Sequence, residues 1–164
     1  MKRRFFLAAL PAALAAGCGF QLRRVDGMPF ASLYVDAPPD SVVAQRLRTL
    51  LATDRRTRLA ASAAEAEAVL KLTREERTRT ILSLSGAGRV TEYRLGLRLR
   101  YSVSGRDERV LAAPETIELN RDLTYDDSQL LAKGAEEQLL IRDMDDTAAL
   151  RILRRLQSID SGST

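Results

Sequence analysis

An alternation of apolar and basic residues over residues 94–103 constrains the fold of this chain more than any other feature. One side of the segment is apolar and carries Leu95, Leu97, Leu99, Tyr101 and Val103. The other side is basic and carries Arg94, Arg98 and Arg100. Because successive side chains of a strand point to opposite faces, this pattern predicts a β-strand. The sheet that contains it should therefore be covered on one face only.

Two further long strands are expected on either side of this segment, joined to it by tight turns. The period of two in residues 68–84 predicts the first, and its buried face carries Leu70, Leu72, Leu82 and Leu84. Gly86 and Gly88 mark a hairpin tip, because glycine tolerates positive φ angles. Residues 109–124 predict the other strand, and its inward set comprises Ile117, Leu119 and Leu123. Pro114 within it indicates a sheet edge or a bulge.

Two one-sided helices and a short first strand complete the pattern. Residues 33–35 predict the short strand, and Asp40 is expected to cap the first helix. The apolar face of that helix consists of Val43, Leu47, Leu50 and Leu51. Residues 52–67 are expected to be a connection. A long second helix follows caps offered by residues 126–128, and its apolar stripe runs through Leu140, Met144, Ala148, Ile152 and Leu156.

These elements predict a single two-layer α+β domain over residues 33–157. Two helices should pack on one face of a four-stranded, mostly antiparallel sheet. The first strand should join this mixed sheet through the helical crossover. Residues 158–164, rich in Ser and Gly, are expected to form a flexible tail.

The N-terminal residues 1–17 have the order of a lipoprotein signal peptide. Basic residues precede an apolar run that is too short to cross a bilayer, and small residues lead to Cys18. The sequence Ala15-Ala16-Gly17-Cys18 resembles the bacterial lipobox, in which the cysteine becomes the lipid-modified first residue of the mature protein. A plain signal peptide with a nearby cysteine is the alternative. Residues 18–32 are then the lipidated N-terminus and a lead segment.

Two neighbouring signals bear on export and destination. Gly19, rather than aspartate, follows the cysteine, which favours the outer membrane over retention at the inner membrane. Residues 3–7 read Arg-Arg-Phe-Phe-Leu and resemble a twin-arginine export motif, so that both this route and ordinary Sec export stay open. The signal carries three of the 26 basic residues and no acid, so the mature chain is close to neutral.

The composition excludes several classes of function. The chain has no histidine, which removes Ser-His-Asp and Cys-His catalysis and imidazole metal sites. Its single cysteine forms no intrachain disulfide and no thiolate metal cluster. The remaining enzymatic alternative uses carboxylates, and neither a clustered acid site nor a Gly-rich phosphate loop supports it. We therefore expect a protein that is not an enzyme and needs no cofactor or metal.

The arginine row is the strongest candidate for a binding site. The three arginines of residues 94–100 share one face, Arg89 lies close to the hairpin tip, and guanidinium groups match phosphates and carboxylates. The alternative is a solvated sheet face balanced by acids on neighbouring strands, such as Glu118 and Asp122. Nucleic acid is a poor target for an exported protein with few aromatic residues. A phosphorylated lipid or a polar protein lumen fits better.

Several short blocks, taken in order, give the mature chain a recognisable signature. They are Cys18-Gly19-Phe20-Gln21-Leu22-Arg23, Glu92-Tyr93-Arg94-Leu95, Leu123-Thr124-Tyr125-Asp126-Asp127-Ser128, Leu131-Ala132-Lys133, Glu136-Glu137-Gln138-Leu139-Leu140, Asp143-Met144 and Ile152-Leu153-Arg154-Arg155-Leu156. Together with the lipobox, their order and spacing resemble the LptE family of outer-membrane lipopolysaccharide-assembly lipoproteins, over essentially the whole mature chain.

The resemblance implies a domain that sits as a plug in the lumen of the LptD β-barrel, one copy per barrel. The pair would deliver lipopolysaccharide (LPS) to the outer leaflet, and the lipoprotein would also assist folding of the barrel. Family members bind LPS through basic residues. One of these residues, a lysine at the start of the last helix, corresponds to Lys133. Another lies at the hairpin tip, where this chain has Gly86 in place of a basic residue, and Arg89 is the nearest basic residue in the sequence.

The expected LPS-binding residues are accordingly Lys133, Arg89, Arg94, Arg98 and Arg100. An auxiliary lipoprotein of an ABC-type lipid transporter is the alternative, since such proteins can share this small α+β form.

Overall fold

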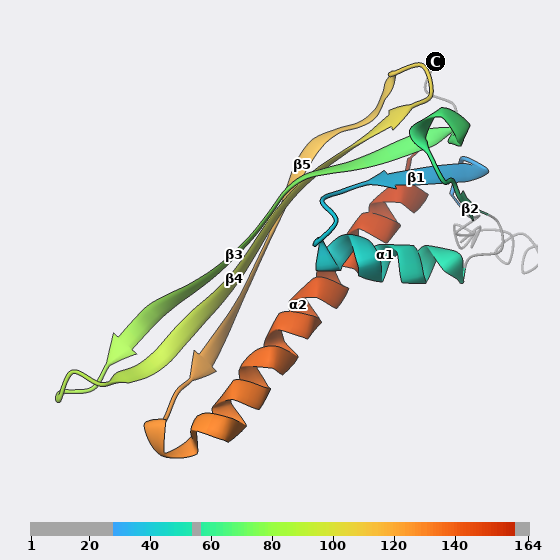
Figure 1. The fold of residues 1–164 in the computed structure, drawn as a ribbon. Helices are drawn as coiled ribbons and strands as arrows, with labels where there is room; N and C mark the ends of the chain where they lie inside the picture. The colour runs from blue at the N-terminus through green and yellow to red at the C-terminus, as the bar shows by residue number, and fades with distance from the viewer. Residues whose placement is uncertain (1–27, 54–56, 160–164) are drawn as a thin grey trace, which may run out of the picture.

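The computed structural model describes residues 28–53 and 57–159. Its regular elements are, in chain order, β1 (Ser32–Asp36), α1 (Val42–Ala52), β2 (Arg58–Leu59), β3 (Ala68–Leu84), β4 (Val90–Gly105), β5 (Val110–Thr124) and α2 (Leu130–Gln157) (Figure 1). Short 3-10 helices occupy Ala63–Glu65 and Asp127–Gln129. The predicted signal peptide, Cys18 and most of the predicted tail lie outside the described residues.

The sheet is mixed and has five strands in the order β2-β1-β3-β4-β5, rather than the four predicted. Strand β1 pairs in parallel with both β2 and β3, while β3, β4 and β5 form an antiparallel meander. The additional strand, β2, has two residues and lies within the predicted connection over residues 52–67. A strand of that length shows no period of two, so the sequence gives no sign of it.

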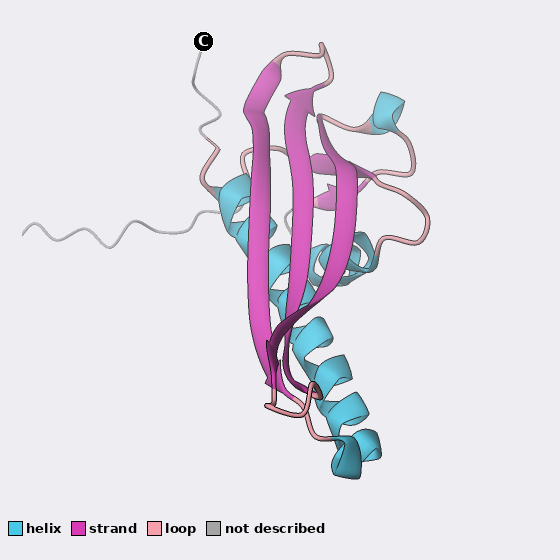
Figure 2. Ribbon diagram, turned by 90° about the vertical axis from the view of Figure 1, so that its left-hand side faces the viewer, coloured by secondary structure: helices cyan, strands magenta, loops and turns pink. Residues whose placement is uncertain are grey.

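Both helices lie on the same face of the sheet, as predicted, and leave the other face open (Figures 1 and 2). The apolar side of β4 is buried beneath them, from Leu95 to Val103. The stripe on α2 is buried from Met144 to Leu156, and Leu140 is partly buried. Strand β5 is a sheet edge, as Pro114 indicated.

The core extends beyond the predicted domain boundaries. Met28 and Phe30, in the predicted lead segment, are buried, and so is Ile159, in the predicted tail. Apolar side chains that pack in this way remove nonpolar surface from water and stabilise the domain. The folded unit therefore begins before β1 and reaches past the end of α2.

A β-bulge at Thr73 changes which side chains of β3 face the helices. The register shifts between Leu72 and Arg74, so that the inward positions have even numbers before the bulge and odd numbers after it. Leu70 and Leu72 are buried as predicted, but Leu82 and Leu84 are exposed. The inward positions beyond the bulge carry Glu75, Arg77, Arg79 and Ile81, which lie opposite inward residues of β4. The prediction for Leu82 and Leu84 was wrong because the bulge reverses the alternation and two further register shifts follow, between Ile81 and Ser83 and between Ser83 and Leu84.

Helix α1 is capped by Ser41 and not by Asp40. The Oγ of Ser41 accepts a hydrogen bond from the backbone N–H of Ala44 at 3.1 Å and donates one to Glu75 Oε2 at 2.5 Å. Ser41 is buried, whereas Asp40 is exposed. The helix begins at Val42, and the cap must be the residue directly before it.

We expect Ser41→Ala to lower the free energy of unfolding by about 1–2 kcal/mol, because it removes this cap and a donor to Glu75. The matched control is Asp40→Ala, which should change the unfolding free energy by less than about 0.5 kcal/mol. Urea denaturation followed by circular dichroism measures both variants. Equal effects of the two substitutions would contradict the assignment of the cap.

Candidate functional site

The arginine row lies on the uncovered outer face of β4, and two of its three members are paired with acids. Arg94 donates to Asp122 through Nε and Nη2, at 2.7 and 2.8 Å. Arg98 Nη2 lies 2.6 Å from Glu118 Oε1. Both acids lie directly opposite on β5, and the hydrogen bonds from Arg94 lower the pKa of Asp122. At these two positions the partners are the acids that the sequence offered as balancing charges.

The side chains of Arg100 and Arg89 are exposed, and they differ from Arg94 and Arg98 in their neighbours. Arg100 lies opposite Arg74 of β3 and Thr116 of β5. Arg89 lies at the β3–β4 hairpin, directly after Gly88, which has a positive φ angle of 73°. Among the described residues, no carboxylate forms an ion pair with either guanidinium group. These two arginines are therefore the members of the predicted set that can take an anion without displacing a partner.

Lys133 lies in the first turns of α2 and is engaged by Glu136. Its Nζ is 2.8 Å from Glu136 Oε2, and its side chain is 17 % exposed. Hydrogen bonds from Ser128 lower the pKa of nearby Asp126, and the charge of Lys133 contributes to the same shift. An incoming phosphate would have to replace Glu136 as the partner of this ammonium group.

The structure brings the predicted residues together in two groups rather than one. Arg89 and Lys133 belong to the same end of the molecule, where the β3–β4 hairpin and the start of α2 meet (Figure 1). Arg94, Arg98 and Arg100 lie along the outer sheet face. We call the first region the distal end, because the sheet edge formed by β1 and β2 lies at the opposite end.

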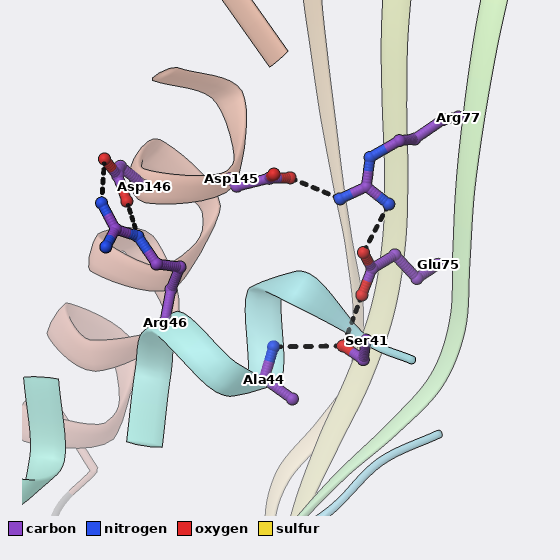
Figure 3. A network of polar contacts seen from close by, with 7 residues as sticks. All are labelled: Ser41, Ala44, Arg46, Glu75, Arg77, Asp145 and Asp146. Atoms are coloured by element: carbon purple, nitrogen blue, oxygen red, sulfur yellow. Dashed lines mark hydrogen bonds and ion pairs between the residues drawn. The ribbon is translucent and has the colours of Figure 1, made fainter. Parts of the chain in front are cut away.

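A charged network joins α1, β3 and α2, and the sequence alone did not predict it (Figure 3). Arg77 Nη1 lies 2.6 Å from Glu75 Oε1, and Nη2 lies 2.5 Å from Asp145 Oδ1. The side chains of Glu75 and Asp145 are 7 % and 5 % exposed. Glu75 also accepts the hydrogen bond from Ser41, so one guanidinium bridges two nearly buried carboxylates that belong to different layers.

The electrostatics of this network depend on Arg77. Burial raises the pKa of Asp145, and the hydrogen bond from Arg77 only partly opposes that effect. On the solvent side of the helices, Arg46 of α1 forms an ion pair with Asp146 and lowers the pKa of that carboxyl. The spacing of charges in β3 gives no sign of the network, because the bulge at Thr73 is what turns Glu75 and Arg77 toward the helices.

The functional groups of the candidate site are guanidinium, ammonium and carboxylate groups carried by strands and helices. No three His, Cys or acidic side chains in this part of the chain are arranged to hold a metal ion. A search of the same residues finds no helix with the length and apolar character needed to cross a membrane.

The fold is similar to that of lipoproteins of known structure. Lipoprotein B from Nitrosomonas europaea, solved by solution NMR, is 34% identical with a TM-score of 0.76, and the match covers 88% of this chain and 94% of that one. Rare lipoprotein B from Shewanella oneidensis is 29% identical with a TM-score of 0.66, over 77% and 94% of the two chains. A minor lipoprotein from Acinetobacter baumannii shares the fold at 21% identity, with a TM-score of 0.62 over 78% and 91%.

A search of the curated proteins gives no match. A family model described as LptE, lipopolysaccharide-assembly, matches residues 30–156, which is most of the chain. This family is non-catalytic, in agreement with the function classes that the missing histidines exclude. The order of the sequence blocks, the two-layer fold and the family match agree, and the chain belongs to the LptE family of lipopolysaccharide-assembly lipoproteins.

Proposed function

We propose that this protein is the lipoprotein subunit of an outer-membrane LPS translocon. It is anchored through lipids on Cys18, and its domain sits in the lumen of one LptD β-barrel. There it assists assembly of the barrel and contacts LPS on its way to the outer leaflet. The match to the LptE family over residues 30–156 is the observation that carries this proposal.

The character of the outer sheet face supports a position within a barrel. Rows of paired charges, such as Arg94–Asp122 and Arg98–Glu118, cover it. The interior of a transmembrane β-barrel is polar, and a charged face of nearly balanced sign is compatible with such a wall. Arg94 and Arg98 are then available to exchange their partners for barrel side chains, while Arg100 has room for a carboxylate or a phosphate.

The cations of the distal end support contact with a phosphorylated lipid. Arg89 is exposed at the hairpin tip, and Lys133 lies at the beginning of α2. A guanidinium group binds a phosphate through two parallel hydrogen bonds, and an ammonium group binds it as a point charge. We assign LPS binding to Lys133, Arg89, Arg94, Arg98 and Arg100, with the distal pair meeting the lipid first.

Affinity purification of the lipidated chain from outer membranes tests the proposal. A stable 1:1 complex with a large β-barrel protein, carrying LPS, is the expected result. Recovery of an inner-membrane ATPase complex in its place would favour the auxiliary role in an ABC-type lipid transporter. Recovery of the chain alone would remove the support for a translocon subunit.

We expect Lys133→Glu to weaken LPS binding about tenfold, which corresponds to about 1.4 kcal/mol, without unfolding the domain. The substitution reverses a charge beside Glu136 and Asp126 and so repels phosphate groups. Arg154→Glu is the matched control, because it makes the same charge reversal in the last turn of α2. Binding is measured with fluorescent LPS, and folding by thermal circular dichroism. Equal LPS affinities of the Lys133→Glu variant and the wild type would rule out Lys133 as a ligand.

A further inference from the structure

A hollow lies in the middle of the uncovered sheet face, where the arginine row of β4 is interrupted. Gly96 occupies the position between Arg94 and Arg98, and it lies opposite Thr78 of β3 and Asn120 of β5. The hollow has a volume of about 270 Å³. We call it the Gly96 socket, and its polar lining side chains are those of Glu76, Thr78, Arg98, Glu118 and Asn120.

The lack of a side chain at residue 96 is what keeps the Gly96 socket open. A Cβ atom at this position would lie 2.5 Å from Thr78 Oγ1 and 3.3 Å from Asn120 Oδ1. The first of these distances is shorter than van der Waals contact allows. Glycine inside a strand weakens the sheet, and it often marks a place where a ligand or another backbone approaches closely. The Gly96 socket therefore has the form of a site for an approaching group.

Three oxygen atoms around the Gly96 socket are available as hydrogen-bond acceptors. Arg98 directs both Nε and Nη2 to Glu118 Oε1, at 2.9 and 2.6 Å, so that Oε2 of this carboxylate accepts no bond from the described residues. Thr78 Oγ1 and Asn120 Oδ1, which lie over Gly96, likewise accept none from the described part of the chain. A hydrogen-bond donor that enters the socket would meet acceptors from two strands.

The lining of the Gly96 socket carries more negative than positive charge. Glu76 and Glu118 contribute carboxylates, and Arg98 contributes the guanidinium of the lining. Arg74 approaches Glu76 from outside the socket, with its Nε 3.2 Å from Oε2, but both side chains of this pair are exposed. Water screens such a pair and makes it weak. An acidic side chain would therefore meet two like charges in the socket, whereas a basic side chain would meet two opposite charges.

The available acceptors and the charge of the lining together indicate the occupant. The ammonium group of lysine and the guanidinium group of arginine carry donors and no acceptor, so either group suits a site of free oxygens. An apolar side chain would cover these oxygens without offering a donor, which is costly. The inward-facing side chains of a transmembrane β-barrel are polar, so the wall of a barrel can supply a basic side chain at this point.

We propose that the Gly96 socket receives a basic side chain from the inner wall of the β-barrel. This inference rests on the proposed function, which sets the outer sheet face against that wall, and it names the chemistry of one contact between them. The oxygens of Thr78, Asn120 and Glu118 accept the hydrogen bonds of the incoming group. Gly96 provides the space for it.

Placing a charged side chain in the Gly96 socket of the lipidated full chain tests the proposal. All variants carry Thr78→Ala, which removes the oxygen nearest to a Cβ atom at residue 96. Gly96→Lys then adds a basic group, and Gly96→Glu adds an acidic one. Gly134→Lys is the matched control, because a Cβ atom at that position has no neighbour within 4 Å. Each chain is purified by affinity from outer membranes, and the barrel protein that accompanies it is quantified.

The two charges at residue 96 should have different effects on the recovery of the barrel. Relative to the chain with Thr78→Ala alone, we expect Gly96→Lys to lower recovery at least fivefold, because two cations meet in the socket. We expect Gly96→Glu to lower it less than twofold, because the acid pairs with the incoming base. The Gly134→Lys control should also stay within twofold of the reference.

The other outcomes separate this inference from the proposed function. An equal or larger loss for Gly96→Glu would overturn a basic occupant, and no loss for either variant would overturn contact at the Gly96 socket. Both results leave the proposed function standing, since the reference still recovers the barrel. Failure of the wild-type chain to recover a barrel would overturn the proposed function itself. Thermal melts verify folding, and Asn120→Lys with Asn120→Glu repeats the comparison on the rim if Gly96→Lys unfolds.

Discussion

Replacing Arg77 by alanine is expected to lower the free energy of unfolding by about 3–5 kcal/mol. Arg77 is the guanidinium that bridges Glu75 and Asp145, whose side chains are nearly buried. Without it, two carboxylates share a site of low water content with no opposite charge between them. Denaturant unfolding measures the loss, which would be one of the largest that a single polar substitution produces in this domain.

A surface pair supplies the control for this prediction. Arg98 and Glu118 form an ion pair of comparable geometry, with both side chains more than half exposed. We expect Arg98→Ala to cost at most about 1 kcal/mol, because water screens an exposed pair and replaces its hydrogen bonds. Equal losses at Arg77 and Arg98 would contradict the importance of burial at the network.

The pH dependence of the Arg77→Ala variant distinguishes charge from packing. Burial already raises the pKa of Asp145 in the wild type, and removal of Arg77 leaves that effect unopposed. The folded state then binds a proton more tightly than the unfolded state, so the variant gains stability as the pH falls toward the raised pKa. We expect the difference from wild type to shrink between pH 7 and pH 5. If the difference in unfolding free energy stayed constant across this range, the loss would come from the packing of the Arg77 alkyl chain and not from its charge.

Replacing Cys18 by serine is expected to abolish lipidation completely, because the thiolate is the acceptor of the lipid in a lipobox. Each acyl methylene contributes about 0.8 kcal/mol to membrane binding, so loss of all the chains releases the domain from the membrane. Intact mass spectrometry and membrane fractionation measure the two effects. The released domain should keep its fold, since the described core begins at Met28.

Wild-type protein is the reference for the Cys18 prediction. Its mass should show acyl chains on Cys18 and cleavage after Gly17. A wild-type spectrum without acyl mass would defeat the lipobox interpretation and favour the plain signal peptide. A normal LPS supply to the cell surface in the Cys18→Ser strain would show that the anchor is dispensable for delivery.

Local patterns predicted most of the fold. The apolar side chains of residues 94–103 and those of the stripe from Met144 to Leu156 are buried, as the sequence predicted. Each depends only on the geometry of one element, which repeats every 2 residues in a strand and about every 3.6 in a helix. The prediction missed β2 because a strand of two residues is too short to show a period, and it failed at Leu82 and Leu84 because register shifts interrupt the alternation. The cap of α1 was misplaced by one residue, because the sequence pattern does not fix where the helix begins.

The sequence predicted the residue types of the candidate site and offered Glu118 and Asp122 as balancing acids, but it did not predict which residue pairs with which. Arg94 and Arg98 were identified as basic residues on one face, yet their pairing with Asp122 and Glu118 depends on the register of β5. Lys133 was identified from a family resemblance, and its pairing with Glu136 is visible only when the helix is built. Pairing decides whether a cation is free to bind, and pairing is a property of the folded chain.

The sequence by itself determined the class of this protein. The sequence that resembles a lipobox, the absence of histidine, the alternating strand and the ordered blocks are local or compositional features, and together they indicate an α+β lipoprotein of the LptE family. Only the tertiary structure decided which side chains face the helices and which acid pairs with which base. The bulge at Thr73 turns Glu75 and Arg77 inward and, together with later irregularities in β3, leaves Leu82 and Leu84 exposed near the start of α2. One inserted residue reverses the side chains that follow it up to the next register shift. The location of each shift follows from the pairing with β4, which no pattern within β3 contains.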